Sequence, residues 1–305
     1  MTRPRRRIAV ILPIGLLVVA LVAAGTWWAV ARYQATHGPE CTVPRPAGDS
    51  SDAPLHLDAV QLQHASTINA VGLARGESER ARVIALATAW QESSLRNIDR
   101  GDRDSLGLFQ QRPSQGWGEA GQIMDPVYSA GQFFDHLAKV PDWQGMSLTE
   151  AAQAVQRSGH PEAYAKWERD AQTLAEQLSG ALAPTLSCRA RARASTAAEP
   201  TRTRVSGTEH AAPRLADLLA AANTEMTGVR VDPVPAEGRE ATMTVELPGI
   251  APDAAARALG AWLVAHATSY GVTDVTADGR QWSGHAWRNR GGDLPAGSVG
   301  VSVEG

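Results

Sequence analysis

The chain has 305 residues, of which 20% are charged and 43% hydrophobic, and its formal net charge at pH 7 is −3. Its two cysteines and eight scattered histidines show no metal-ligand spacing, which excludes a structural zinc site. It has a single apolar stretch of membrane-spanning length, and one span cannot by itself enclose the path of a transported substrate.

The N-terminal segment has the pattern of a membrane anchor. Residues 8–31 are uncharged and largely apolar, enough to cross a bilayer core of about 30 Å at about 1.5 Å per residue. Residues 1–7 contain four arginines, so the positive-inside rule predicts a cytoplasmic N-terminus and an extracytoplasmic bulk. We therefore predict a single-pass membrane protein. A cleaved signal peptide is the alternative, although the apolar run is long for one and no small-residue cleavage site ends it.

A stalk and a pair of cysteines frame the next region. Residues 32–55 are polar and contain four prolines, which is typical of a stalk. Cys41 and Cys188 stand just outside the ends of a helical region, and in an oxidising compartment such a pair is expected to be bonded. We predict a disulfide that joins the two ends of that region, with two separate thiols as the alternative.

Residues 56–188 are predicted to form a mainly α domain without a clear strand. Apolar residues recur at helical spacing, with short polar joints, over residues 57–74, 78–95, 126–139, 147–157 and 161–180. In the last of these helices Tyr164, Trp167, Leu174 and Leu178 form one stripe, which favours core packing.

Glu92 has the clearest chemical implication in the chain. It follows residues 83–90, which are apolar except for Thr88 and therefore typical of a helix buried on all sides. The negative end of the helix dipole and the apolar neighbours both favour the neutral carboxylic acid. Cleavage of a glycosidic bond needs such an acid, because the leaving oxygen must be protonated.

The surroundings of Glu92 in the sequence resemble a known family. Glu92-Ser93, a polar loop, the segment Gly107-Leu108-Phe109-Gln110 and the helical residues 125–140 are similar to the lysozyme-like domain of lytic transglycosylases. The resemblance covers about residues 57–180. It implies peptidoglycan as the substrate, Glu92 as the only catalytic carboxylate and a sugar groove at the glycine-containing turn. The predicted groove residues are Ser93, Gly107, Leu108, Phe109, Gln110, Trp117 and Tyr164.

Departures from the family pattern leave part of the mechanism open. Such enzymes often carry a hydroxyl residue midway along the loop to orient the Glu, whereas this chain has Gly101 in that region. Ser93, Ser94 or Ser105 would have to substitute. The family's Ala-Tyr-Asn-Ala-Gly segment corresponds here to residues 155–161, which lack its Tyr; Tyr164 lies close by.

The acidic loop introduces a second alternative. It is closer to goose-type lysozymes, which makes Asp102 and Asp104 candidates for a second carboxylate. With Glu92 alone, the muramyl group would close on itself to an anhydro sugar, whereas a second carboxylate about 6.5–9.5 Å away would allow hydrolysis by water. Alternatively, both aspartates are solvated loop residues. Trp117 stands in a glycine-flanked turn, where it either stacks on a sugar ring or packs.

The remaining chain is predicted to contain a linker and a further domain. Residues 189–208 carry five arginines against one glutamate, typical of a disordered spacer or of a segment that attracts anionic wall polymers. Residues 209–305 are predicted to form a small α+β domain with helices at 213–224 and 252–270 and strands at 242–247 and 299–303. Trp282 and Trp287 there either pack against the sheet or bind glycan.

Together these features predict a membrane-anchored, extracytoplasmic enzyme that cleaves peptidoglycan with Glu92 as general acid and base. The predicted fold class is a mainly α lysozyme-like domain with an N-terminal transmembrane helix and a small C-terminal α+β domain. The expected partners are peptidoglycan strands, the membrane through residues 8–31 and anionic wall polymers. No cofactor, metal or nucleic acid is expected. The alternative is a catalytically silent wall-binding or scaffold protein with the same fold.

Overall fold

The computed structural model describes residues 41–46, 53–158, 161–189, 213–231, 238–290 and 294–304. The chain divides into the units Met1–Pro39 and Glu40–Gly305, and every described residue belongs to the second. Among these residues, no helix is both long and apolar enough to cross a bilayer. The anchor predicted at 8–31, the basic tail, most of the stalk and nearly all of the linker lie outside the described residues.

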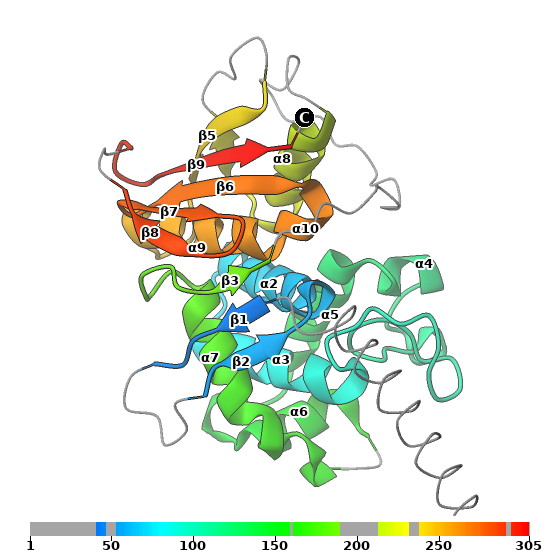
Figure 1. The fold of residues 1–305 in the computed structure, drawn as a ribbon. Coiled ribbons are helices and arrows are strands. Elements are labelled where there is room, and N and C mark those ends of the chain that lie inside the picture. Colours follow the sequence, from blue (N-terminus) through cyan, green and yellow to red (C-terminus); the bar gives the residue numbers. More distant parts are fainter. Residues whose placement is uncertain are drawn as a thin grey trace, which may run out of the picture. The chain divides into compact units, whose positions relative to one another are not determined.

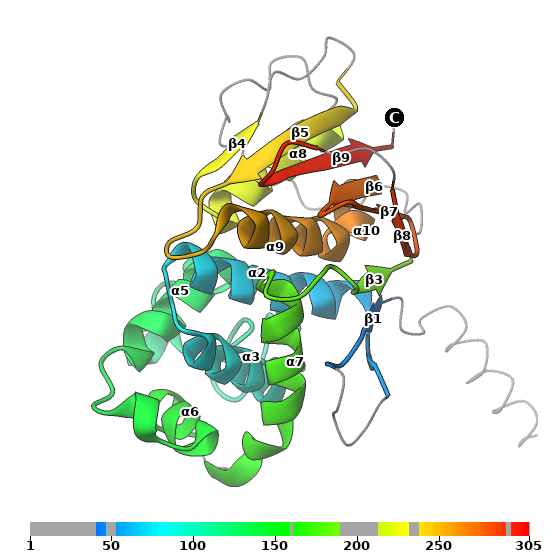
Figure 2. The same ribbon diagram turned by 90° about the vertical axis from the view of Figure 1, so that its left-hand side faces the viewer.

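Helix α3 (Glu79–Ser93) is the centre of the helical part (Figure 2). All of its residues from Ala81 to Trp90 are buried, as expected for a helix that is apolar on nearly every side. It contacts four further helices, which are α2 (Ala59–Ala74), α5 (Pro126–Leu137), α6 (Leu148–Gln156) and α7 (Glu168–Leu178). The helix predicted over 161–180 begins instead with two 3-10 turns, Pro161–Ala163 and Ala165–Trp167. A short helix, α4 (Ala120–Ile123), precedes α5.

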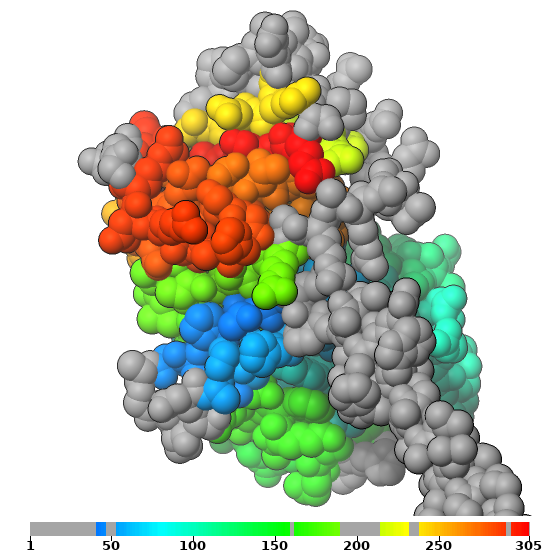
Figure 3. Space-filling model, in the orientation of Figure 1, coloured from blue at the N-terminus to red at the C-terminus, as the bar shows by residue number. Residues whose placement is uncertain are grey.

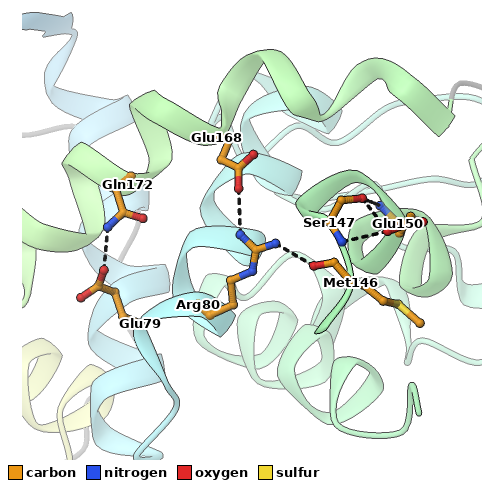
Figure 4. A network of polar contacts seen from close by, with 7 residues as sticks. All are labelled: Glu79, Arg80, Met146, Ser147, Glu150, Glu168 and Gln172. Carbon is orange, nitrogen blue, oxygen red and sulfur yellow. Dashed lines mark hydrogen bonds and ion pairs between the residues drawn. The ribbon is translucent and has the colours of Figure 1, made fainter. Parts of the chain in front are cut away.

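Polar contacts join the start of α3 to α6 and α7 (Figure 4). Arg80 donates to Glu168 Oε1 at 2.8 Å and to the Met146 carbonyl oxygen at 2.9 Å. Ser147 then caps α6, because its hydroxyl accepts from the Glu150 amide while the Ser147 amide donates to the Glu150 carboxylate. These contacts hold the beginning of α6 and α7 against the central helix.

A three-stranded antiparallel sheet joins the two ends of the helical part. Its order is β2–β1–β3, from β1 (Cys41–Val43), β2 (Leu55–Leu57) and β3 (Ser187–Cys188). Cys41 and Cys188 stand opposite each other in the register and form a disulfide, which confirms the predicted pair. The prediction missed this sheet, because strands of two or three residues are too short to show an alternation of period two.

The C-terminal part contains a six-stranded antiparallel sheet in the order β4–β5–β9–β6–β7–β8 (Figure 1). Its strands are β4 (Val229–Val231), β5 (Glu240–Val245), β6 (Val272–Ala277), β7 (Arg280–Ser283), β8 (Trp287–Asn289) and β9 (Ser298–Val303). The helices are α8 (Pro213–Glu225), α9 (Pro252–Ala265) and α10 (Ala267–Tyr270), and α9 contacts β5, β6 and β9.

The predicted fold class is therefore wrong. The described residues contain two antiparallel sheets, one of them within the region predicted as mainly α, and no helix able to span a membrane. The prediction found two strands of the larger sheet and missed the rest. One signal was available, because Asp278 and Gly279 form the two-residue turn between β6 and β7 with φ of 53° and 66°, the backbone that favours this pair in hairpins.

The C-terminal part packs directly on the helical part, where α9 contacts α2 and α7. At Gly180, a Cβ atom would stand 1.9 Å from the Ala254 carbonyl oxygen, so only a glycine permits this approach of the two backbones. In Figure 3 the residues of β6, β7 and β8 lie against those next to β3. Trp282 Nε1 donates to Ser187 Oγ and Trp287 Nε1 donates to the Leu186 carbonyl oxygen, so both tryptophans pack at this contact.

Candidate active site

Glu92 lies half-buried in the last turn of α3, as predicted from the apolar residues before it. The helix ends sharply, because Ser94 and Leu95 both adopt left-handed backbone angles, with φ of 55° and 58°. Two residues of α2 hold this turn: Gln61 Nε2 donates to the Ser94 carbonyl oxygen at 3.1 Å, and His64 Nδ1 lies 2.8 Å from that of Leu95. The backbone after Glu92 is thus fixed by a neighbouring helix.

Tyr164 supplies the direct partner of Glu92. Its hydroxyl donates to Glu92 Oε1 over 2.6 Å, and its side chain is fully buried. Burial, and then the hydrogen bond to Glu92, raises the pKa of Tyr164 well above its ordinary value, so the phenol remains a donor. The prediction left the residue that orients Glu92 unassigned and considered three serines. In the structure the side chain that contacts the Glu92 carboxyl is instead that of a tyrosine 72 positions along the chain.

The glycine-containing turn reaches the end of α3 through its backbone. Ser93 Oγ donates to the Leu108 carbonyl oxygen at 2.8 Å, and the Gly107 amide donates to the Ile98 carbonyl oxygen at 2.8 Å. Leu108 and Phe109 have no exposed surface, and the Phe109 ring stacks on Phe133. The prediction that these two side chains line a groove is therefore wrong, because the turn directs them into the core.

Gly107 is required for backbone geometry. Its φ is +77°, and a Cβ atom there would stand 2.7 Å from the Ile123 carbonyl oxygen. The prediction counted Gly107 among the groove residues, whereas the structure places the Ile123 carbonyl oxygen where a side chain at this position would go. Gln110, at the end of the turn, is half-buried, its Nε2 donates to the Gly107 carbonyl oxygen, and its side chain lies over Gly101.

Asp104 is bound within its own loop. It accepts from Arg112 Nε at 2.7 Å and from both the amide and the hydroxyl of Ser114. Arg112, followed by Ser114, holds the pKa of this carboxyl well below its usual range. Asp102 has a side chain that is 93% exposed and a long ion pair with Arg103. Within the described residues neither carboxylate contacts Glu92, which matches the alternative in which both are loop residues.

Trp117 is 7% exposed, so the glycines beside it do not leave its ring open to solvent. It stacks on His136 with ring centroids 3.9 Å apart. A cleft of about 490 Å³ adjoins this pair and is bounded by α5, α6 and the turn that contains Gln115. In the described part of the chain, no group of three or more histidine, cysteine or acidic side chains could hold a metal ion.

Further residues near Glu92 were missed by the sequence reasoning. Trp167, predicted as core, stacks on Trp90 and donates from Nε1 to Gln91 Oε1 at 3.0 Å. The sequence has no local signal for these contacts or for those of Gln61 and His64, because every pair joins segments that are far apart along the chain.

The chain has no match among protein-family models, and no curated protein matches it.

Proposed function

We propose that this protein cleaves the glycan strands of peptidoglycan, with Glu92 as its single acid and base. The observation that supports this best is the hydrogen bond from the buried Tyr164 hydroxyl to Glu92 at the end of the central helix. It orients one carboxyl oxygen and leaves the half-buried side chain accessible, as a general acid requires. The resemblance of residues 57–180 to lytic transglycosylases supplies the substrate class.

In the proposed reaction the carboxylic acid of Glu92 protonates the glycosidic oxygen as the bond to the muramyl carbon breaks. The acetamido group of the sugar stabilises the positive centre, so no protein nucleophile is needed. Glu92, now a carboxylate, removes the proton from the sugar's own 6-hydroxyl, which attacks the same carbon. The product is an anhydro end, and Glu92 regains its proton.

The contacts of Asp104 and the exposure of Asp102 support formation of an anhydro end over hydrolysis. Asp104 has its oxygens engaged by Arg112 and Ser114, and Asp102 extends into solvent. A second carboxylate that activates water would need to face the sugar with free oxygens. We therefore propose lytic transglycosylase chemistry, and the disulfide fits an extracytoplasmic, oxidising location.

The test uses Glu92→Gln, which removes the acidic proton and keeps the side-chain volume. We expect loss of strand cleavage with a change in unfolding free energy within about 1 kcal/mol. Glu246→Gln is a matched control, because Glu246 is 74% exposed in the C-terminal part. Mass spectrometry of the digested strands reads the product, since a reducing end carries one more water than an anhydro end.

Two outcomes would contradict the proposal. Residual activity of Glu92→Gln above a tenth of that of the unaltered protein would mean that another residue is the acid. Binding of peptidoglycan without cleavage by the unaltered protein would favour the silent wall-binding alternative.

A further inference from the structure

The cleft beside Trp117 and His136 combines an apolar floor with a cationic edge. The stacked rings of Trp117 and His136, with Val140 and Val155, supply the floor. Lys139 and Arg157 line the same cleft, and both are exposed. Among the residues that the structure describes, no acidic side chain lines it.

The two cationic side chains have no interaction partner within the described part of the chain. Neither Lys139 nor Arg157 has a side-chain hydrogen bond or an ion pair there, although most arginines of the helical part pair with a carboxylate or a carbonyl oxygen. The backbone of Arg157 is held in place, because the residue caps α6 with a left-handed conformation and its amide donates to the Gln153 carbonyl oxygen at 2.8 Å. Two unpaired cations on one cleft favour an anionic ligand.

The cleft adjoins the surroundings of Glu92 at two points. Gln156, which lines it, donates from Nε2 to the Phe109 carbonyl oxygen at 2.6 Å, next to the residue that Ser93 binds. Arg157 immediately precedes Ser158, whose side chain hydrogen-bonds Tyr164, the partner of Glu92. These contacts link the cleft to the surroundings of Glu92, so a strand bound at Glu92 can extend to Lys139 and Arg157.

We propose that this cleft binds the carboxylates of the stem peptide on a muramyl residue next to the bond that is cleaved. The inference rests on the proposed function and extends it. In peptidoglycan the negative charge is carried by the peptide, and the sugars are neutral except where a lactyl group lacks its peptide. Lys139 and Arg157 bind that charge, the apolar floor contacts the peptide side chains, and the enzyme prefers strands that carry peptides.

The experiment compares strands that carry stem peptides with strands from which an amidase has removed the peptides and whose freed lactyl carboxylates have then been converted to amides, so that the stripped strands are neutral. Binding is measured on the Glu92→Gln protein, so that no strand is cleaved, and kcat and KM are measured on the active protein. We expect Lys139→Gln/Arg157→Gln to weaken binding of peptide-bearing strands about tenfold at low salt and to raise their KM to match. Binding of the stripped strands should change less than twofold.

Two controls separate this site from general charge and folding effects. Arg230→Gln/Arg288→Gln removes the same charge from exposed positions of the C-terminal part and should leave both affinities unchanged. Lys139→Arg keeps the charge and should retain the preference. The melting temperature of each variant shows whether it is folded.

Two results would overturn the proposal. One is an equal affinity of the Glu92→Gln protein for peptide-bearing and stripped strands. The other is that Lys139→Gln/Arg157→Gln lowers the affinity for both kinds of strand by the same factor. Because this binding readout needs no catalysis, it can fail while cleavage is observed, and it can succeed while cleavage is absent. If the affinity depends on the presence of anionic wall polymer and not on the stem peptide, the cleft is assigned to that polymer and the proposal is also contradicted.

Discussion

Tyr164 is the residue whose hydroxyl reaches Glu92, and Tyr164→Phe removes that hydroxyl while keeping the ring in the core. We expect kcat to fall by about ten- to a hundredfold, the range for losing a hydrogen bond to a charged group, with KM nearly unchanged. Tyr128→Phe is the matched control, since its hydroxyl donates only to the Trp117 carbonyl oxygen among described groups. An unchanged kcat in Tyr164→Phe would mean that this hydroxyl does not position Glu92.

Alanine substitutions at Gly107 and Gly116 distinguish the energetic cost of backbone strain from that of steric overlap. Both have positive φ, at +77° and +81°, but a Cβ atom at Gly116 would meet nothing within 4 Å, whereas at Gly107 it would meet the Ile123 carbonyl oxygen at 2.7 Å. We expect Gly116→Ala to lower the unfolding free energy by about 1–2 kcal/mol and Gly107→Ala to lower it further. Urea unfolding measures both, and equal losses would show that the Ile123 backbone adapts freely.

At the scale of elements, helix α2 contacts the turn that follows Glu92 through His64, whose Nδ1 lies 2.8 Å from the Leu95 carbonyl oxygen. Burial lowers the pKa of this imidazole, although the contact with the Leu95 carbonyl oxygen opposes that effect. His266 and Arg96 also lower it, while Glu225 raises it. The folded protein therefore favours the neutral imidazole more than the unfolded chain does.

The sign of the resulting pH dependence follows from this shift. The contribution of His64 is fully present above the ordinary histidine pKa of about 6.5 and is lost as the pH falls below it. We expect the melting temperature to drop more steeply between pH 7.5 and about pH 5 in the unaltered protein than in His64→Gln. His56→Gln, at an exposed position of β2, is the control. Parallel curves for the unaltered protein and His64→Gln would assign the pH dependence to other groups.

At the scale of the whole molecule, the disulfide joins β1 to β3 and connects two cysteines with a sequence separation of 147. Closing a loop of that length stabilises the fold by roughly 4–5 kcal/mol in the chain-entropy model. We expect Cys41→Ser/Cys188→Ser to lower the melting temperature by about 8–20 °C, taking about 2–4 °C for each kcal/mol in a chain of this size. The unaltered protein in reductant should melt like the variant, and alkylation of both thiols without reductant would contradict the bond.

The sequence by itself determined those features that depend on nearby residues. Helical spacing located α2, α3, α5 and α6, and the apolar run before Glu92 was enough to place that carboxyl at the end of a buried helix. Two cysteines allow only one intrachain bond, so the sequence predicted the pair, and the structure decided between this bond and two separate thiols.

Only the tertiary structure decided which groups meet at Glu92. Tyr164 contacts Glu92 itself, while Gln61 and His64 contact the turn that follows it. These pairs are 31 to 72 positions apart along the chain, and local patterns carry no information about them. The same holds for side-chain direction: the turn after Gly107 sends Leu108 and Phe109 into the core, because its backbone must satisfy hydrogen bonds with Ser93 and Gln156. Strands of two or three residues likewise exist only through their partners, which is why the small sheet became visible in the fold alone.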